Sequence, residues 1–433
     1  MRLFSLAHVG TFEVENYGDL LFPLILQKEL SSRISDITYR TYAPLDGKNT
    51  LPIFSKEYPH HFAKDFPPSA IVIGGGDIIS FDPRIASCYC EQWNNKINPH
   101  SACWAIPGIF RPSGVPLVWN APGIPYPFTA DQAFFVRSMA EEVDYLTVRD
   151  EISLIHLHKT DVQKEITIVP DTCCLLSKHY SSELLKERAQ KILDPLKLRL
   201  REALVFQAHL HVNEDQISEL VYVLKQLKQL LNRPILLLPI GYCHKDDVLL
   251  SKIQKKSKDA FIFVENKLDP LSIAAVIAHA GCFLGTSLHG NITAFSYGVP
   301  FIIYNAVSLA KLNGFAHLID EQERHTDNLQ DILGKYRLLN ASVAQSTLHK
   351  MTTRIEAHFD KMSVLIQQKS SFSAEHRNHC LLMQYLEVIH ELRHWKCECE
   401  TMKNSKTWKI ASLLKKSPFS KRIGEFIINS VKA

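Results

Sequence analysis

Hydrophobic and polar positions along the first 175 residues follow the rhythm of strand–helix–strand units. The apolar run at 3–8 predicts a first strand. After a polar loop, Leu20, Leu21, Leu24 and Ile25 predict one face of a helix, in which Pro23 lies early enough to be tolerated. Further apolar runs predict strands at 70–73, 116–120, 145–148 and 166–169.

The same rhythm returns after a charged, helix-forming stretch at 177–201. Strands are predicted at 203–207, 235–240, 260–264, 282–285 and 301–304. Helices are predicted at 214–231 and 289–297, and another begins with Asp269 as cap and Pro270 in its first turn. The fold class is therefore α/β, with two doubly wound (Rossmann-like) domains in series.

From about residue 342 the strands stop, and apolar residues recur at helical spacing. They are Met351, Ile355, Phe359, Met362 and Ile366, followed by Leu382, Leu386 and Ile389 in a second helix. We therefore expect a Rossmann-like domain at 1–176, a crossover at 177–200, a second Rossmann-like domain at 201–340, a helical segment at 341–400 and a tail at 401–433.

Composition changes this picture little. The 433 residues are 46% hydrophobic and 22% charged, as in a soluble globular protein, and the net charge of +4 does not favour a nucleic-acid partner. No apolar run reaches the roughly 20 residues of a membrane span, and the N-terminus predicts a strand, not a signal peptide. The scattered cysteines favour free thiols and a cytoplasmic location. Cys88 with Cys90 and Cys397 with Cys399 lack a second pair at zinc-like spacing, so we expect no metal.

The tail at 401–433 carries eight basic residues and one acidic residue, Glu425, among aromatic and aliphatic side chains. This pattern is typical of a helix lying on an anionic membrane surface. It fits equally well a solvated helix that packs on its own domain.

Polar motifs follow several predicted strands, where doubly wound sheets place their sites. Asn16 and Asp19 follow the first strand, and Gly74, Gly75, Gly76 and Asp77 follow the strand at 70–73. Three glycines let an anion approach backbone N–H groups, although glycine turns after strands are also common.

Two further motifs have both a functional and a structural interpretation. Arg149 follows another strand and could clamp a carboxylate or phosphate, or form a helix-start ion pair with Asp150. Asp171, in Val169-Pro170-Asp171, is expected to be structural.

The segment Ser287, Leu288, His289, Gly290 and Asn291 lies between a predicted strand and a predicted helix. The N–H groups of this helix N-terminus are expected to face the cleft between the domains. A histidine there can donate or accept a proton near neutral pH, or it can merely cap its own helix. The small and polar neighbours favour a catalytic role.

Taken in order, these motifs resemble the polysaccharide pyruvyl transferase family over residues 8–320. The resemblance implies a GT-B-like arrangement of the two domains and no cofactor. It also implies transfer of the pyruvyl unit of phosphoenolpyruvate to a sugar, with a pyruvate ketal and phosphate as products. His289 matches the family's histidine, Arg149 an anion-binding arginine, and Lys311 a lysine after the Gly-x-Pro strand.

The chain departs from the family pattern at two positions. Many members have an arginine where this chain has Ser287, and a fourth glycine where it has Asp77. The charge for a phosphate would then come from Arg149 and Lys311.

The tail segment 404–410 resembles the ends of bacterial cell-surface glycosyltransferases. That resemblance implies an acceptor, free or lipid-linked, at the inner face of the plasma membrane.

Two other functions compete with pyruvyl transfer. One is a GT-B glycosyltransferase that uses a nucleotide sugar, with Glu265 as the carboxylate that grips the ribose. The other is a catalytically silent partner that binds saccharide. Phosphate release from phosphoenolpyruvate in the presence of a saccharide would distinguish all three.

Overall fold

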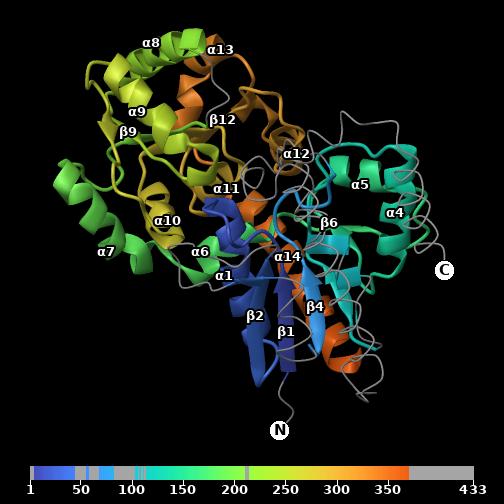
Figure 1. Ribbon diagram of the computed structural model, residues 1–433. Helices are drawn as coiled ribbons and strands as arrows, with labels where there is room; N and C mark the ends of the chain where they lie inside the picture. Colours follow the sequence, from blue (N-terminus) through green and yellow to red (C-terminus); the bar gives the residue numbers. More distant parts are fainter. Residues whose placement is uncertain are drawn as a thin grey trace, which may run out of the picture. The chain divides into compact units, whose positions relative to one another are not determined.

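The computed structural model describes residues 4–43, 55–57, 68–81, 103–105, 107–108, 111, 114–209 and 214–369 (Figure 1). All of them fall in the first of two compact units, which ends at residue 374. The predicted helix around 382–389, the basic tail and the two Cys-x-Cys pairs lie outside the described residues. Below, residues up to 176 are called the first half, and residues 201–340 the second half.

The first half is built on a five-stranded parallel sheet with the order β3-β2-β1-β4-β5. Its strands are β1 (Phe4–Val9), β2 (Ile37–Ala43), β3 (Ser55–Glu57), β4 (Ala70–Ile73) and β5 (Leu117–Trp119). Every residue of β4 and β5 is buried, which explains why they are continuous apolar runs in the sequence. A parallel pair of short strands, β6 (Thr147–Val148) and β7 (Thr167–Ile168), follows.

The helices of the first half connect these strands. They are α1 (Tyr17–Ser31), α4 (Ala130–Glu141) and α5 (Glu151–His158). Asn16 caps α1 by accepting from the Gly18 amide, which is why the helix begins three residues before its apolar face. Pro23 consequently lies in the second turn of α1.

The second half is built on a six-stranded parallel sheet with the order β10-β9-β8-β11-β12-β13. Its strands are β8 (Leu204–Gln207), β9 (Ile235–Leu237), β10 (Ile262–Phe263), β11 (Cys282–Gly285), β12 (Phe301–Tyr304) and β13 (His325–Thr326). Its helices are α8 (Glu214–Leu231), α9 (Asp246–Lys256), α10 (Pro270–Ala278), α11 (Leu288–Ser296), α12 (Ala310–Leu318) and α13 (Leu329–Gly334).

The two halves are joined by α6 (Leu176–His179) and α7 (Ser182–Leu193), and α14 (Gln345–Lys369) follows the second half. The apolar face predicted for α14 is buried, with no member of the set more than 2% exposed. One hydrophobic cluster includes Val72 of β4, Phe283 of β11 and Phe359 of α14. Both sheets and α14 therefore share a continuous core.

Most of the predicted strands and helices are present, several with identical bounds. Those at 70–73, 214–231, 282–285 and 301–304 coincide with β4, α8, β11 and β12. Strands β2, β3 and β13 and helices α4, α5, α9, α12 and α13 were not predicted from the sequence. The pattern of β2 is hard to recognise because its first four residues are only half-buried and include Arg40.

No helix in the described part of the chain is both long and apolar enough to cross a membrane.

Candidate active site

The carboxyl ends of the first-half strands bring together residues that are far apart in the sequence. Asp19 lies in the first turn of α1, Asp77 follows β4, Arg149 follows β6 and Asp171 follows β7. The second half adds His289 on α11 and Lys311 on α12. Since parallel strands end at one edge of their sheet, their following loops converge on one place.

Arg149 is the centre of this group, and its side chain is 5% exposed. Its Nη2 lies 2.5 Å from Asp77 Oδ1, its Nε 3.5 Å from Asp150 Oδ2 and its Nη1 3.6 Å from Asp171 Oδ2. Arg149 therefore pairs with three carboxylates and not with Asp150 alone, whether it also clamps an anion or only supports the fold. A grip on the donor stays a prediction for this guanidinium, which already has these partners.

Lys311 extends the network from the second half. Its Nζ lies 3.0 Å from Asp77 Oδ2, and its side chain is 33% exposed. Burial alone would raise the pKa of Asp77, but Lys311 and Arg149 hold it well below its usual value. Asp77 thus pairs with both cations that the sequence assigns to the donor.

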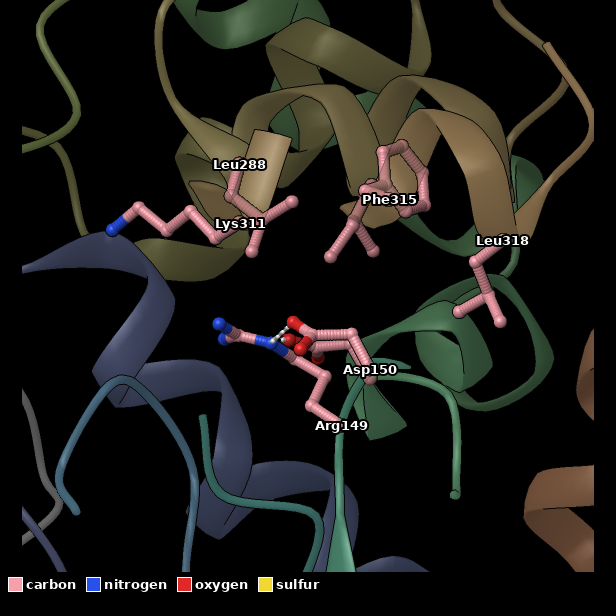
Figure 2. Close-up of a pocket in the computed structure, with 8 residues that line it drawn as sticks. Arg149, Asp150, Leu288, Lys311, Phe315 and Leu318 are labelled. Atoms are coloured by element: carbon pink, nitrogen blue, oxygen red, sulfur yellow. Dashed lines mark ion pairs between the residues drawn. The ribbon is translucent and has the colours of Figure 1, made fainter. Parts of the chain in front are cut away.

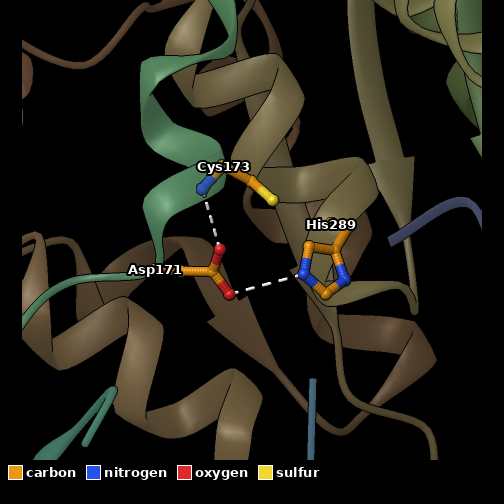
Figure 3. A group of neighbouring side chains, drawn as sticks. All are labelled: Asp171, Cys173 and His289. Atoms are coloured by element: carbon orange, nitrogen blue, oxygen red, sulfur yellow. Dashed lines mark hydrogen bonds and ion pairs between the residues drawn. The ribbon is translucent and has the colours of Figure 1, made fainter. Parts of the chain in front are cut away.

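Asp171 and His289 connect the two halves directly (Figure 3). Asp171 Oδ1 accepts from the Cys173 amide, which caps the 3₁₀ turn Thr172–Leu175, and Oδ2 lies 3.3 Å from His289 Nε2. Burial would raise the pKa of Asp171, yet His289 and Arg149 hold it below its usual value. The structural role expected for Asp171 is present in this cap, and the same side chain also faces His289, the catalytic candidate.

The His289 ring is held against α1 of the first half. Its centroid lies 5.3 Å from that of Phe22, edge to face. A Cβ on Gly18 would lie 1.9 Å from His289 Nδ1, so only glycine lets the ring lie this close to the helix. Ser287, not His289, caps α11 by accepting from the Gly290 amide. The ring is therefore fixed between α1 and Asp171.

Three backbone amides at and just before the start of α11 have partners within the protein. Gln207 Oε1 accepts from the backbone amides of Thr286 at 3.1 Å and Ser287 at 2.9 Å. The Gly290 amide is bound to Ser287 Oγ. These three donors serve the fold, and Gln207 at the end of β8 was not singled out in the sequence.

The other predicted residues of this segment are buried. Asn291 Nδ2 donates to the carbonyl oxygens of Gly285 and Ser287, which fixes the turn between β11 and α11. Gly290 packs against Phe283, and Leu288 is 3% exposed. Their predicted contacts with substrate stay predictions, and the structure adds a role in holding His289.

The glycine loop after β4 lies beside Asp19. Gly74, Gly75 and Gly76 all have positive φ, and a Cβ on Gly76 would lie 2.8 Å from Asp19 Oδ1. Asp19 Oδ2 accepts from Asn16 Nδ2 at 3.1 Å. Burial raises the pKa of Asp19 to about 6, against the lowering effect of His289 and Lys311.

A pocket of about 220 Å³ opens beside these groups (Figure 2). Its lining residues are Arg149, Asp150, Asp171, Leu288, Ile292, Lys311, Phe315 and Leu318. Arg149 and Asp150 face Leu288, Lys311, Phe315 and Leu318 across it. The pocket thus has a charged side from the first half and a largely apolar side from the second.

Asp171, Cys173 and His289 are a group of metal-binding residue types among the described residues, with donor atoms within 4.8 Å of one another. Burial raises the pKa of the Cys173 thiol well above its usual value, which disfavours the thiolate that a metal needs. The Arg149 guanidinium also lies beside Asp171 Oδ2, the oxygen that faces His289. The residues fit an ion pair better than a metal site, and the absence of a metal stays a prediction.

Glu265, the ribose-binding candidate of the alternative function, is exposed beyond the end of β10.

Two UDP-GlcNAc 2-epimerases are among the solved structures that resemble this chain. The UDP-GlcNAc 2-epimerase of Methanocaldococcus jannaschii is 13% identical with a TM-score of 0.51, over 84% of this chain and 100% of that one. The UDP-GlcNAc 2-epimerase of Neisseria meningitidis is 14% identical with a TM-score of 0.48, over 85% and 100%. At this identity the first likeness shows the fold alone, and it confirms the predicted GT-B-like α/β class.

No curated protein matches the sequence. The family model described as polysaccharide pyruvyl transferase matches residues 16–306, which include Asp19, Asp77, Arg149, Asp171 and His289. With two thirds of its length matched, and with the family's motifs gathered at one site, this chain belongs to the polysaccharide pyruvyl transferase family and is a transferase.

Proposed function

We propose that this chain transfers the pyruvyl unit of phosphoenolpyruvate to a sugar of a surface polysaccharide or its lipid-linked precursor. The products are a pyruvate ketal and phosphate. The observation that carries the proposal is the His289 ring, held by Asp171 at 3.3 Å and lying beside the network of Arg149 and Lys311.

The donor must be protonated at its methylene carbon before C2 can accept a sugar hydroxyl. Asp171 lies beside His289 Nε2, and His289 is the proposed source of that proton. Lys311, which is one-third exposed, can exchange Asp77 for a phosphate oxygen. The reaction as proposed needs neither metal nor cofactor.

The test is phosphate release from phosphoenolpyruvate with a mixture of saccharide acceptors. We expect His289→Ala to lower turnover by about 10²-fold or more while leaving the thermal unfolding curve in place. His317→Ala is the matched control, because His317 is exposed on the neighbouring helix α12. Unchanged turnover in His289→Ala would contradict the proposal, as would a wild type that releases no phosphate.

We also propose that the basic tail at 401–433 holds the enzyme at an anionic membrane surface, near a lipid-linked acceptor. The support is its eight basic residues among apolar ones. Sedimentation of the full chain with anionic vesicles at low salt, lost as salt rises, is the expected result. Failure to sediment at low salt would leave the tail as a packing element.

A further inference from the structure

Asp19 lies where an acidic residue ordinarily serves its own helix. In the first turn of α1 it meets the positive end of the helix dipole, which stabilises a carboxylate. Its Oδ2 accepts from Asn16 Nδ2, which is consistent with this local role. That role accounts for only one of its two oxygens.

The other oxygen faces the loop after β4. Because a Cβ on Gly76 would lie 2.8 Å from Asp19 Oδ1, only glycine at 76 leaves this oxygen uncovered on that side. His289 and Lys311 of the second half and Asp77 of the first act on the Asp19 carboxyl electrostatically, and Thr11 hydrogen-bonds to it. Gly18, the residue before Asp19, lies against the His289 ring, and Asp77, the residue after Gly76, pairs with Lys311. Asp19 therefore belongs to the same group of side chains as His289 and Lys311.

Asp19 also differs in protonation from its neighbours. Asp77 and Asp171 have lowered pKa values because Arg149, Lys311 and His289 lie beside them. Burial outweighs the cations at Asp19 and raises its pKa to about 6. A carboxyl of this kind gives and takes protons close to neutral pH, which ion-paired carboxylates do not.

Building on the pyruvyl transfer proposed above, we propose that Asp19 is the second proton-transfer group of this site and serves the sugar hydroxyls while His289 serves the donor carbon. Each sugar hydroxyl that bonds to C2 must lose a proton, and Asp19 takes the proton of the first hydroxyl while His289 acts as the acid at the donor carbon.

The protons balance with these two groups. His289 gives a proton to the methylene carbon, C2 bonds to the first sugar oxygen, and the proton of that hydroxyl passes to Asp19. The bond between C2 and the phosphate oxygen then breaks, and phosphate leaves with the proton from Asp19. The second hydroxyl bonds to C2, and its proton restores His289. Each group returns to its starting form.

The test compares full-length Asp19→Asn with wild type, using phosphoenolpyruvate and a saccharide acceptor that wild type accepts. We expect kcat to fall by about 10²-fold or more, while the dissociation constant of phosphoenolpyruvate changes by less than about threefold. The rise of wild-type kcat with pH through about 6, where Asp19 loses its proton, should be absent in the variant.

Glu15→Gln is the matched control, because Glu15 lies in the loop just before α1 and pairs with Lys267. The Asp19→Asn fold should be intact. A carboxyl whose pKa is raised on folding lowers stability as pH rises through about 4 to 6, so the variant should melt at or above wild type at pH 7.5.

The outcomes separate this inference from the proposed function. Near-normal kcat in Asp19→Asn overturns the inference alone, as does weaker donor binding at unchanged kcat. A wild type that releases no phosphate with any acceptor overturns the proposed function and this inference with it.

Discussion

The first wall of the pocket is the charged group of Arg149, Asp150 and Asp171, which line it, and of Asp77, which pairs with Arg149. These four side chains of the first half are almost completely buried. The wall from the second half is largely apolar, with Leu288, Ile292, Phe315 and Leu318, and carries Lys311, while His289 lies beside it. In the first wall one cation, Arg149, pairs with three carboxylates, so its loss would leave all three without their common partner. In the second, His289 and Lys311 each pair with one carboxylate. We infer that the first wall fixes geometry and that the second holds the groups that turn to the ligand.

The largest expected effect comes from breaking the first wall at its centre. Arg149→Ala leaves three carboxylates buried without their common cation, so we expect a loss of about 3–5 kcal/mol in the free energy of unfolding. Urea unfolding measures it. Arg137→Ala, which removes an exposed pair with Asp161, should cost less than about 1 kcal/mol. Equal effects of the two variants would show that the wall is not held by Arg149.

Asp171 belongs to the first wall but faces His289, so its substitution tests whether a residue of the first wall also affects turnover. Asp171→Asn keeps the shape and removes the charge beside His289 Nε2, and we expect turnover to fall by about 10²-fold. Asp150→Asn is the control, since it also removes a carboxylate from Arg149 but caps α5 at Ser153. If Asp171→Asn and Asp150→Asn lost turnover to a similar extent, the loss of a carboxylate beside Arg149 would explain both effects, and orientation of His289 would not be needed.

Asp246 in the second half sharpens the comparison, because it is a buried carboxyl that hydrogen-bonds to amides: Oδ2 accepts from Gln207, Ile240 and Gly241. Burial raises the pKa of Asp246 to about 7, whereas Lys311, His289 and Arg149 lower the pKa values of Asp77 and Asp171. A raised carboxyl pKa lowers stability as pH rises from about 4 to 7. Asp246→Asn should therefore stabilise the protein by on the order of 2 kcal/mol at pH 8.

Thermal unfolding across this pH range is the measurement for Asp246→Asn. The gain over wild type should grow between pH 4 and 7 and stay level above 7. A gain that does not depend on pH would show that removing a titrating carboxyl is not its cause.

The smallest effect on stability is expected at Lys311. Its side chain is one-third exposed, so Lys311→Ala should change the free energy of unfolding by less than about 1 kcal/mol. If it turns to the donor phosphate, KM for phosphoenolpyruvate should rise by about tenfold or more with the fold intact. Steady-state kinetics and urea unfolding of Lys311→Ala, set beside the same measurements on Arg149→Ala, compare the two walls directly. A stability loss as large as that of Arg149→Ala would remove the distinction between them.

Several elements of the site follow from local sequence. The strands β4, β11 and β12 are buried on both faces and read as continuous apolar runs, so their ends, and the polar residues after them, can be located. Asp19, Asp77, Arg149 and His289 were found this way. Asp171 was assigned only a structural role, because its local motif accounts for its bond to the Cys173 amide. Its contact with His289, 118 residues later in the chain, cannot be predicted from that motif. Gln207 was missed, although it is the last residue of β8.

The sequence by itself determined the α/β class, the order of the motifs and the position of the candidate His289 at the start of a helix, because strand burial, helix caps and residue chemistry are local properties. Only the tertiary structure decided what each charge pairs with. Asp77 forms ion pairs with both Lys311 and Arg149. Gln207 accepts from the Ser287 amide at the start of α11, and burial raises the pKa of Asp19 to about 6. Ion pairs and desolvation depend on distances across two sheets that share one core, and no spacing along the chain encodes them.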